Sequence, residues 1–267
     1  MSLIYEKKDQ IAYLTLNRPE AHNALDPETM VDLAAAWEDF RDDDCLRCAV
    51  LTGTGEATFC SGADLGRLIP LFTGAKKPET DADFAVSKDP TLLSRAMLRD
   101  FELHKPVIAA INGRAIAGGM ELLYSTDIRV AAQGAVFGLQ EVKWAIVPLM
   151  GSTVKLPRQI PYARAMELLL TGELVDADEM LRLGFLNKVV EPGRVMEEAV
   201  RYAQIISDNG PLAVRAIKKS VISAMGMPLE EGLKKEIEIG SPVFLSKDAV
   251  EGPRAFKEKR KPRYKGQ

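Results

Sequence analysis

Short apolar segments alternate with amphipathic stretches in the first two thirds of the chain. The apolar segments have the length of β-strands, and they cover residues 11–16, 48–52, 107–111 and 128–131. After the first of them, Asp26 and Pro27 mark a helix start, and apolar residues then recur at helical spacing from Met30 to Phe40. Short strands separated by helices predict an α/β fold with layered sheets.

The pattern becomes helical from about residue 162. Asp176 and Gly184 mark the two ends of one helix. Further helices are predicted over residues 195–207, 212–225, 229–240 and 249–259. Residues 67–88 are rich in Pro, Gly and charged residues without sustained periodicity, so they predict a long surface loop or flap. We therefore expect an α/β core over residues 1–190 and a helical C-terminal part over residues 191–267.

Composition and charge narrow the class of protein. The 267 residues are 46% hydrophobic and 27% charged, as in ordinary globular proteins, and the net charge is −3. This balance gives no general signature of nucleic-acid or membrane binding, and the basic run near the C-terminus is interpreted as a solvated tail. No apolar run is long enough for a membrane-spanning helix, and the first residues do not resemble a signal peptide, so we expect a cytoplasmic protein.

The cysteines and histidines suggest no metal site. Cys45 and Cys48 have C-x-x-C spacing, but no second such pair or neighbouring histidine supplies further ligands. The two histidines, His22 and His104, are far apart in the sequence. We expect the thiols to be reduced and structural, as in most proteins of the cytoplasm.

Candidate chemistry lies in the segments around two glutamates. Gly118 and Gly119 follow a predicted strand and open a helical run that contains Glu121. Glycines there allow a ligand close to the backbone, and a helix start offers free N–H groups and a positive dipole end to an oxyanion. Tight packing of a helix on a strand, or a simple loop, explains the glycines equally well. The segment 59–66 has the same two interpretations, and a second carboxylate, Glu141, follows twenty residues after the first.

Taken together and in order, these motifs resemble the crotonase family, also called the enoyl-CoA hydratase/isomerase superfamily. The resemblance is carried by residues 17–25, 59–66, 112–121, 137–141 and 255–262. It implies a crotonase (ClpP-like) β-β-α spiral core with a helical C-terminal part. It also implies assembly into homotrimers or homohexamers, with no partner of nucleic acid or membrane.

The resemblance also implies an activity, the reversible addition of water to a 2-enoyl-CoA through an enolate. The backbone N–H groups of Ala63 and Gly118 would form the oxyanion hole, and Glu121 and Glu141 would be the catalytic carboxylates. The remaining implied contacts are with the coenzyme A part of the substrate, and they are Arg18, Ala21, Ser61, Asp64, Leu65, Gly66, Phe256 and Lys259. Phe256 and Lys259 are expected to act across a subunit interface, and Asp64 has the alternative role of a helix N-cap. No separate cofactor is implied.

The chain departs from the family pattern at three places, and the second and third leave the acyl specificity open. Ala117 stands where many hydratases have the first of three glycines, and we expect this change to be a small perturbation. Residues 148–152 are bulkier than the usual glycine-rich stretch, and the 67–88 segment is longer than in short-chain hydratases. An enoyl-CoA isomerase, a dehydratase for a specialised acyl-CoA and a non-catalytic acyl-CoA- or RNA-binding relative therefore remain alternatives.

Overall fold

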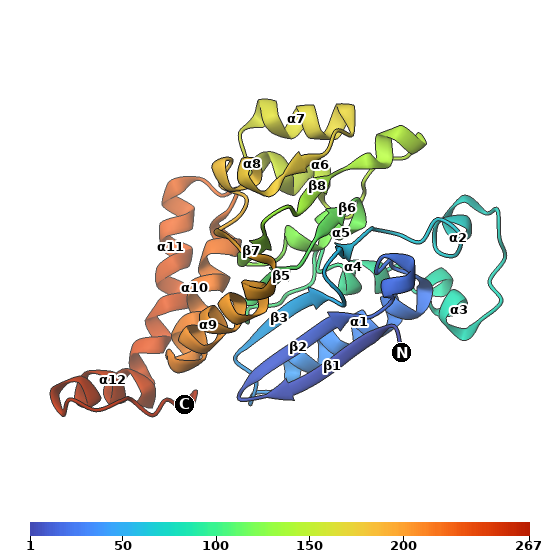
Figure 1. The fold of residues 1–267 in the computed structure, drawn as a ribbon. Coiled ribbons are helices and arrows are strands. Elements are labelled where there is room, and N and C mark those ends of the chain that lie inside the picture. Colours follow the sequence, from blue (N-terminus) through green and yellow to red (C-terminus); the bar gives the residue numbers. More distant parts are fainter.

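The computed structural model describes all 267 residues and has two β-sheets at its centre (Figure 1). The larger sheet has the strand order β1-β2-β3-β5-β7-β10. Its strands are β1 (Leu3–Lys8), β2 (Ile11–Leu16), β3 (Cys48–Gly53), β5 (Val107–Ile111), β7 (Ile128–Ala132) and β10 (Lys188–Val190). Only the β1–β2 pair is antiparallel. Every residue of β3 and β5 is buried, as expected for central parallel strands covered on both faces.

A smaller sheet completes the predicted β-β-α spiral. Its order is β4-β6-β8-β9, with β4 (Thr58–Cys60), β6 (Arg114–Ile116), β8 (Val136–Gly138) and β9 (Val175–Asp176). The chain runs from β3 to β4, from β5 to β6 and from β7 to β8, so each pass adds one strand to each sheet before a helical segment follows. The predicted fold class is confirmed.

The helices match the sequence pattern closely outside one region. Asp26 caps the first helix by accepting a hydrogen bond from the Thr29 amide, and Asp176 does the same for the Glu179 amide. The α-helices are α1 (Pro27–Asp42), α2 (Ile69–Thr73), α3 (Asp81–Lys88), α4 (Leu92–Ala96), α5 (Gly118–Leu123), α6 (Ser152–Lys155), α7 (Tyr162–Thr171), α8 (Ala177–Arg182), α9 (Val195–Asp208), α10 (Pro211–Ala224), α11 (Leu229–Gly240) and α12 (Lys247–Lys257). Short 3-10 helices are η1 (Pro19–Ala21), η2 (Gln140–Trp144), η3 (Leu156–Arg158), η4 (Pro192–Arg194) and η5 (Ser241–Leu245).

The expectation of a long surface loop or flap over residues 67–88 was wrong, because this segment contains α2 and α3. Thr80 and Asp83 form a capping box at the start of α3, in which each side chain accepts a hydrogen bond from the backbone of the other. Arg67 ties the segment to α1 through an ion pair with Glu28 at 2.8 Å. Helix α2 has only five residues and α3 only eight, so the hydrophobic periodicity that normally indicates a helix is weak here.

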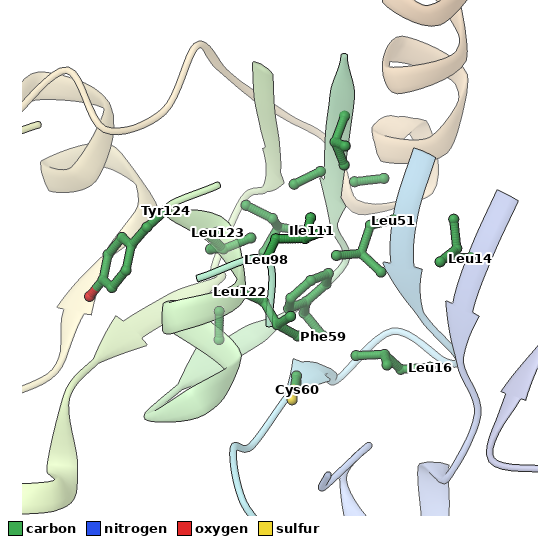
Figure 2. Close-up of a cluster of buried hydrophobic side chains, with 14 of the residues drawn as sticks. Leu14, Leu16, Leu51, Phe59, Cys60, Leu98, Ile111, Leu122, Leu123 and Tyr124 are labelled. Atoms are coloured by element: carbon green, nitrogen blue, oxygen red, sulfur yellow. The ribbon is translucent and has the colours of Figure 1, made fainter. Parts of the chain in front are cut away.

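One hydrophobic core of 53 buried residues lies between the sheets and the helices. Figure 2 shows Leu51, Phe59, Ile111 and Leu122 directed toward one another where the two sheets and α5 meet. Cys60 is also buried there, and burial raises the pKa of its thiol to about 12. This packing fixes the ends of β4 and β6, from which the two turns of the site project.

Of the C-terminal helices, α9 packs on the larger sheet, and the later helices form a separate layer. Helix α9 packs on β3, β5 and β7, whereas α10 and α11 pack chiefly on each other. Helix α12 and the C-terminus lie at the opposite end of the molecule from α2 and α3 (Figure 1). The predicted domain division near residue 190 would separate α9 from the core strands on which it packs. The division stays a prediction. No helix combines the length and apolar character that a membrane crossing requires.

Candidate active site

Two glycine-containing turns are pressed together beyond β4 and β6. Gly62 has φ +92°, and a Cβ added to it would lie 2.8 Å from the Cβ of Ala117 and 2.9 Å from the nitrogen of Gly118. A Cβ on Gly119 would lie 2.1 Å from the carbonyl oxygen of Cys60. Real Cβ atoms do not approach so closely, so glycine is required at both positions. The tight-packing interpretation of these glycines is therefore correct, and it also places the two turns side by side.

Two backbone amides at these turns have no protein acceptor. Leu25 donates to the Gly62 carbonyl at 2.8 Å, and Asp64 donates to the Leu25 carbonyl at 2.9 Å. This bridge uses the amides on either side of Ala63 and leaves the Ala63 N–H directed away from Leu25. Gly118 is the first residue of α5, so its N–H also lacks a partner within the helix. Both residues line one cavity, and together they can bind a single oxyanion.

That cavity has a volume of about 580 Å³ and is mostly apolar. Its walls come from the turns just described, from α2 and α4, and from the segment after η2. The apolar wall residues include Leu65, Leu68, Ile69, Phe72, Leu93, Met97, Trp144, Val147, Leu149 and Met150. Glu121 and Glu141 are the only carboxylates that line it. The combination of a large apolar chamber with a few polar groups is typical of a small-molecule site.

Glu121 is held in one orientation by two hydrogen bonds. It projects from α5 and is 4% exposed. Its Oε1 atom accepts from the Met150 amide at 2.8 Å and from Ser152 Oγ at 2.9 Å. Burial raises the pKa of Glu121 above its usual value, and the bonds from Ser152 and Met150 oppose this rise. The two donors therefore offset part of the cost of burying the charged carboxylate.

Glu141 has a less polar environment. It lies in the first turn of η2 and is 6% exposed, and its Oε2 atom has no hydrogen-bond partner in the protein. Burial raises the pKa of Glu141 to about 7, and the negative charge of Glu121 contributes to the rise. Near neutral pH, a proton therefore resides on Glu141 much of the time. Two carboxylates with different charge states are the usual equipment for paired acid and base chemistry.

Comparison with known proteins identifies the family. A model of the enoyl-CoA hydratase/isomerase family matches residues 6–267. The chain belongs to this family. An enoyl-CoA hydratase of Mycobacterium tuberculosis, EchA19, is 44% identical over 98% of this chain and 95% of its own length. An (E)-benzylidenesuccinyl-CoA hydratase of Thauera aromatica is 40% identical over the full length of both proteins.

Solved structures agree with this assignment to the enoyl-CoA hydratase/isomerase family. A crystal structure of an enoyl-CoA hydratase from Bacillus anthracis has a TM-score of 0.90 and 36% identity, with full coverage of both chains. A putative enoyl-CoA hydratase/isomerase from Mycobacterium abscessus has a TM-score of 0.89 and 39% identity, also with full coverage. The relatives include carnitinyl-CoA dehydratases, such as that of Citrobacter koseri, which is 40% identical over 99% of this chain and 98% of its own. Relatives whose names specify different acyl groups thus share this level of identity with the chain.

Half of the twelve site residues expected from the family resemblance line the cavity. Ser61, Ala63, Leu65, Gly118 and the two glutamates line it. Arg18 and Asp64 instead bind each other, with Arg18 Nη1 at 3.0 Å from Asp64 Oδ2. Asp64 Oδ1 also accepts hydrogen bonds from the Gly66 and Arg67 amides, so it caps the turn that precedes α2. Ala21 and Gly66 do not line the cavity, and the roles of these residues toward coenzyme A stay predictions.

The two C-terminal candidates lie away from the cavity of their own chain. Phe256 is in the last turn of α12 and is 86% exposed, and Lys259 follows just after that helix. Neither lines the cavity. The expectation that they act across a subunit interface is compatible with this position and stays a prediction.

Two residues that bind Glu121 have no signal in the sequence. Residues 148–152 were noted as a departure from the family pattern, but no role was given to Met150 or Ser152. Their bonds to Glu121 span 29 and 31 residues of chain. No local pattern signals such a contact, because it arises only when α5 and α6 pack together.

Proposed function

We propose that this protein adds water reversibly to the double bond of a 2-enoyl-CoA thioester. The observation that carries the proposal is the meeting of two free amides, Ala63 and Gly118, with two buried carboxylates of different pKa in one apolar cavity. The amides would bind the thioester oxygen and stabilise the enolate that forms during the reaction. The 44% identity to an enoyl-CoA hydratase supports the same reaction.

The different environments of the glutamates divide the proton transfers between them. Glu121, which is held by two donors, is the carboxylate suited to accept a proton from the attacking water. Glu141, whose pKa is raised to about 7, is suited to deliver a proton to the α-carbon. Their roles reverse when the enzyme runs as a dehydratase. Because coenzyme A is part of the substrate, the reaction requires no separate cofactor.

We assign an uncharged, apolar acyl group to the substrate. Apart from the two glutamates, the only ionisable side chains that line the cavity are His22 and Arg114. Arg114 lies at the start of β6, where its amide donates to Ala57, and it is not part of the wall that α2, α4 and residues 146–150 supply. That wall contains Phe72 and Trp144 and carries no charge to pair with a charged acyl chain.

Coenzyme A and a second subunit complete the proposed site. Ser61 and Leu65 lie at the cavity, with Gly66, Asp64, Arg18 and Ala21 in the same part of the chain, and Phe256 and Lys259 would come from a neighbouring subunit. Helices α10 to α12 and η5 expose a group of large apolar side chains suited to a homotrimer or homohexamer. These residues include Ile217, Val221, Ile237, Phe244, Leu245, Val250 and Phe256. Light scattering tests the assembly against the chain mass of 29.3 kDa.

The activity is tested by following the loss of the conjugated enoyl-thioester absorbance. Purified protein is mixed with crotonyl-CoA and with longer, branched, cyclic and quaternary-ammonium 2-enoyl-CoAs. We expect turnover of the uncharged substrates, collapse of that turnover in Glu121→Gln and Glu141→Gln, and no effect of Glu197→Gln, a control at an exposed carboxylate on α9. Folded protein that binds CoA esters and turns over none of these substrates would exclude the proposal.

A further inference from the structure

A chain of two hydroxyl groups that do not line the cavity leads to Glu121. Ser152, the first residue of α6, is completely buried, and its Oγ atom lies 2.9 Å from Glu121 Oε1. The same Oγ atom lies 3.2 Å from the hydroxyl oxygen of Tyr124. Tyr124 follows Glu121 by three residues at the C-terminal end of α5, so α5 supplies both outer members and α6 supplies the central one. The three side chains form a Glu121–Ser152–Tyr124 network.

The number of hydroxyl protons determines which group donates each hydrogen bond in this network. Ser152 has one hydroxyl proton, and an ionised carboxylate is the stronger of its two possible acceptors. Ser152 therefore donates to Glu121, and Tyr124 donates to Ser152. Tyr124 is 4% exposed, and its hydroxyl has no other protein partner. Burial raises the pKa of Tyr124, with the neighbouring carboxylates contributing, so its hydroxyl stays protonated and remains a donor.

We propose that Ser152, supported by Tyr124, is a positioning residue that keeps Glu121 ionised and leaves its second carboxylate oxygen free for water. No protein donor binds Oε2, whereas Oε1 accepts both Ser152 and the Met150 amide. The inference rests on the proposed hydratase function, because an ionised Glu121 is what that reaction needs as its base. Ser152 touches neither substrate nor water in this role and acts only through Glu121.

Other charged groups near this network also shift the pKa values of Glu121 and Tyr124. Glu141 faces the same cavity, and Arg99, whose guanidinium donates to the Leu149 carbonyl, lowers the pKa of Glu121 from a distance. The positive charge of Arg129 lowers the pKa of Tyr124 and so opposes part of the rise that burial causes. None of these groups replaces the proton that Ser152 donates to Oε1. The Met150 amide remains when Ser152 is changed, so the loss of Ser152 should weaken the ionised form without abolishing it.

The experiment measures the charge of Glu121 directly by infrared difference spectroscopy between two pH values. The full-length protein is compared with Ser152→Ala, Tyr124→Phe and the double variant, and Glu121→Gln assigns the carboxyl band. Ser207→Ala is the matched control, because Ser207 is also a buried serine but lies on α9, contacts Cys48 and has no hydrogen bond to Glu121. Thermal unfolding is recorded for every variant.

We expect Ser152→Ala to raise the pKa of Glu121 by about one unit, the effect of losing one hydrogen bond to a charged group. Tyr124→Phe should give a smaller rise, and the double variant should match Ser152→Ala because Tyr124 acts through Ser152. The acidic limb of the kcat/KM profile should move by the same amount, with KM unchanged. The ratio of variant to wild-type kcat/KM should return toward one as pH rises above this limb.

An unchanged Glu121 band in both Ser152→Ala and Tyr124→Phe, with only the loss of thermal stability that Ser207→Ala shows, would overturn the inference and leave Ser152 a packing residue. The infrared measurement needs no substrate. A failure of the hydratase proposal would therefore appear as absent turnover in the wild-type protein, separately from any change in the pKa of Glu121.

Discussion

Glu121 and Glu141 lie in one cavity but differ in their hydrogen-bond partners. One oxygen of Glu121 accepts from the Met150 amide and from Ser152, whereas Oε2 of Glu141 is buried without a partner. Hydrogen bonds favour the ionised form of a carboxylate, and unrelieved burial favours the protonated form. The fold thereby makes one glutamate suited to act as a base and the other as an acid. The raised pKa of Glu141 is the basis of the first prediction.

Glu141→Gln should remove activity and increase stability at alkaline pH. Since the pKa of Glu141 is raised to about 7, the folded state binds this proton more tightly than the unfolded state. Binding of this proton therefore adds to the free energy of unfolding at low pH, and this stabilisation is lost as pH rises toward 7. Above pH 7 the wild type bears the full cost of about 3 kcal/mol for a buried charge, which the glutamine avoids.

The measurement is denaturant unfolding of Glu141→Gln and wild type at pH 5 and pH 8. The variant should be more stable at pH 8, and the difference should shrink at pH 5. Its kcat should fall by about 10²–10⁴, the usual effect of removing a positioned acid. A stability difference of equal size at the two pH values would show that Glu141 does not titrate in this range.

Gly118→Pro should abolish one oxyanion donor, with Gly118→Ala as its control. Proline lacks the N–H and is tolerated at the first position of a helix, which Gly118 occupies in α5. An alanine keeps the N–H, and its Cβ would lie no closer than 3.4 Å to any neighbouring atom outside the helix backbone. We expect kcat/KM to fall by about 10²–10³ for proline and by much less for alanine. Similar losses in the two variants would argue against a donor role for this amide.

Ala117→Gly should stabilise the protein. Ala117 has φ 52° and ψ −125°, a conformation that is strained for any residue with a Cβ. The expectation from sequence that this departure is a small perturbation therefore understated its cost. Relief of the strain, less the added freedom of glycine in the unfolded chain, should raise the free energy of unfolding by roughly 1 kcal/mol.

Thermal unfolding checks the Ala117 prediction, with Ala115→Gly as the control. Ala115 lies in β6 and is completely buried, with extended strand geometry. Glycine there removes a packed methyl group and weakens the strand, so Ala115→Gly should lower the melting temperature. If Ala117→Gly lowered it as well, the strain at Ala117 would be offset by contacts of its methyl group.

Lys259→Glu should weaken binding of the nucleotide end of coenzyme A. Lys259 lies beyond α12 and does not line the cavity of its own chain, so this effect requires a neighbouring subunit. We expect KM for an enoyl-CoA to rise roughly tenfold with kcat unchanged, and KM for the corresponding enoyl-pantetheine to stay the same. Lys8→Glu, at the exposed end of β1, is the control for charge alone. Equal changes for the two thioesters would contradict a role at the nucleotide.

Much of this architecture could be predicted because its signals are local. Asp26 and Pro27 start α1 as expected, and the strands at residues 11–16 and 107–111 fall where the apolar segments predicted them. The expectation of a loop or flap over residues 67–88 failed for a reason that is also local. The capping box of this segment, Thr80 with Asp83, is also a local signal, but the helix that follows buries only two residues and so lacks a pattern of apolar residues that would indicate it.

The sequence by itself determined where the backbone must turn and which residues carry charge. Glycines at positions 62, 118 and 119 allow two turns to meet, and the order of motifs around Glu121 and Glu141 identifies the family. Only the tertiary structure decided the chemical state of the two glutamates. A carboxylate's pKa depends on burial and on donors from distant segments, and Ser152 reaches Glu121 across 31 residues because α5 and α6 pack together. Arg18 likewise became an ion-pair partner of Asp64 only when η1 and the turn after β4 came together.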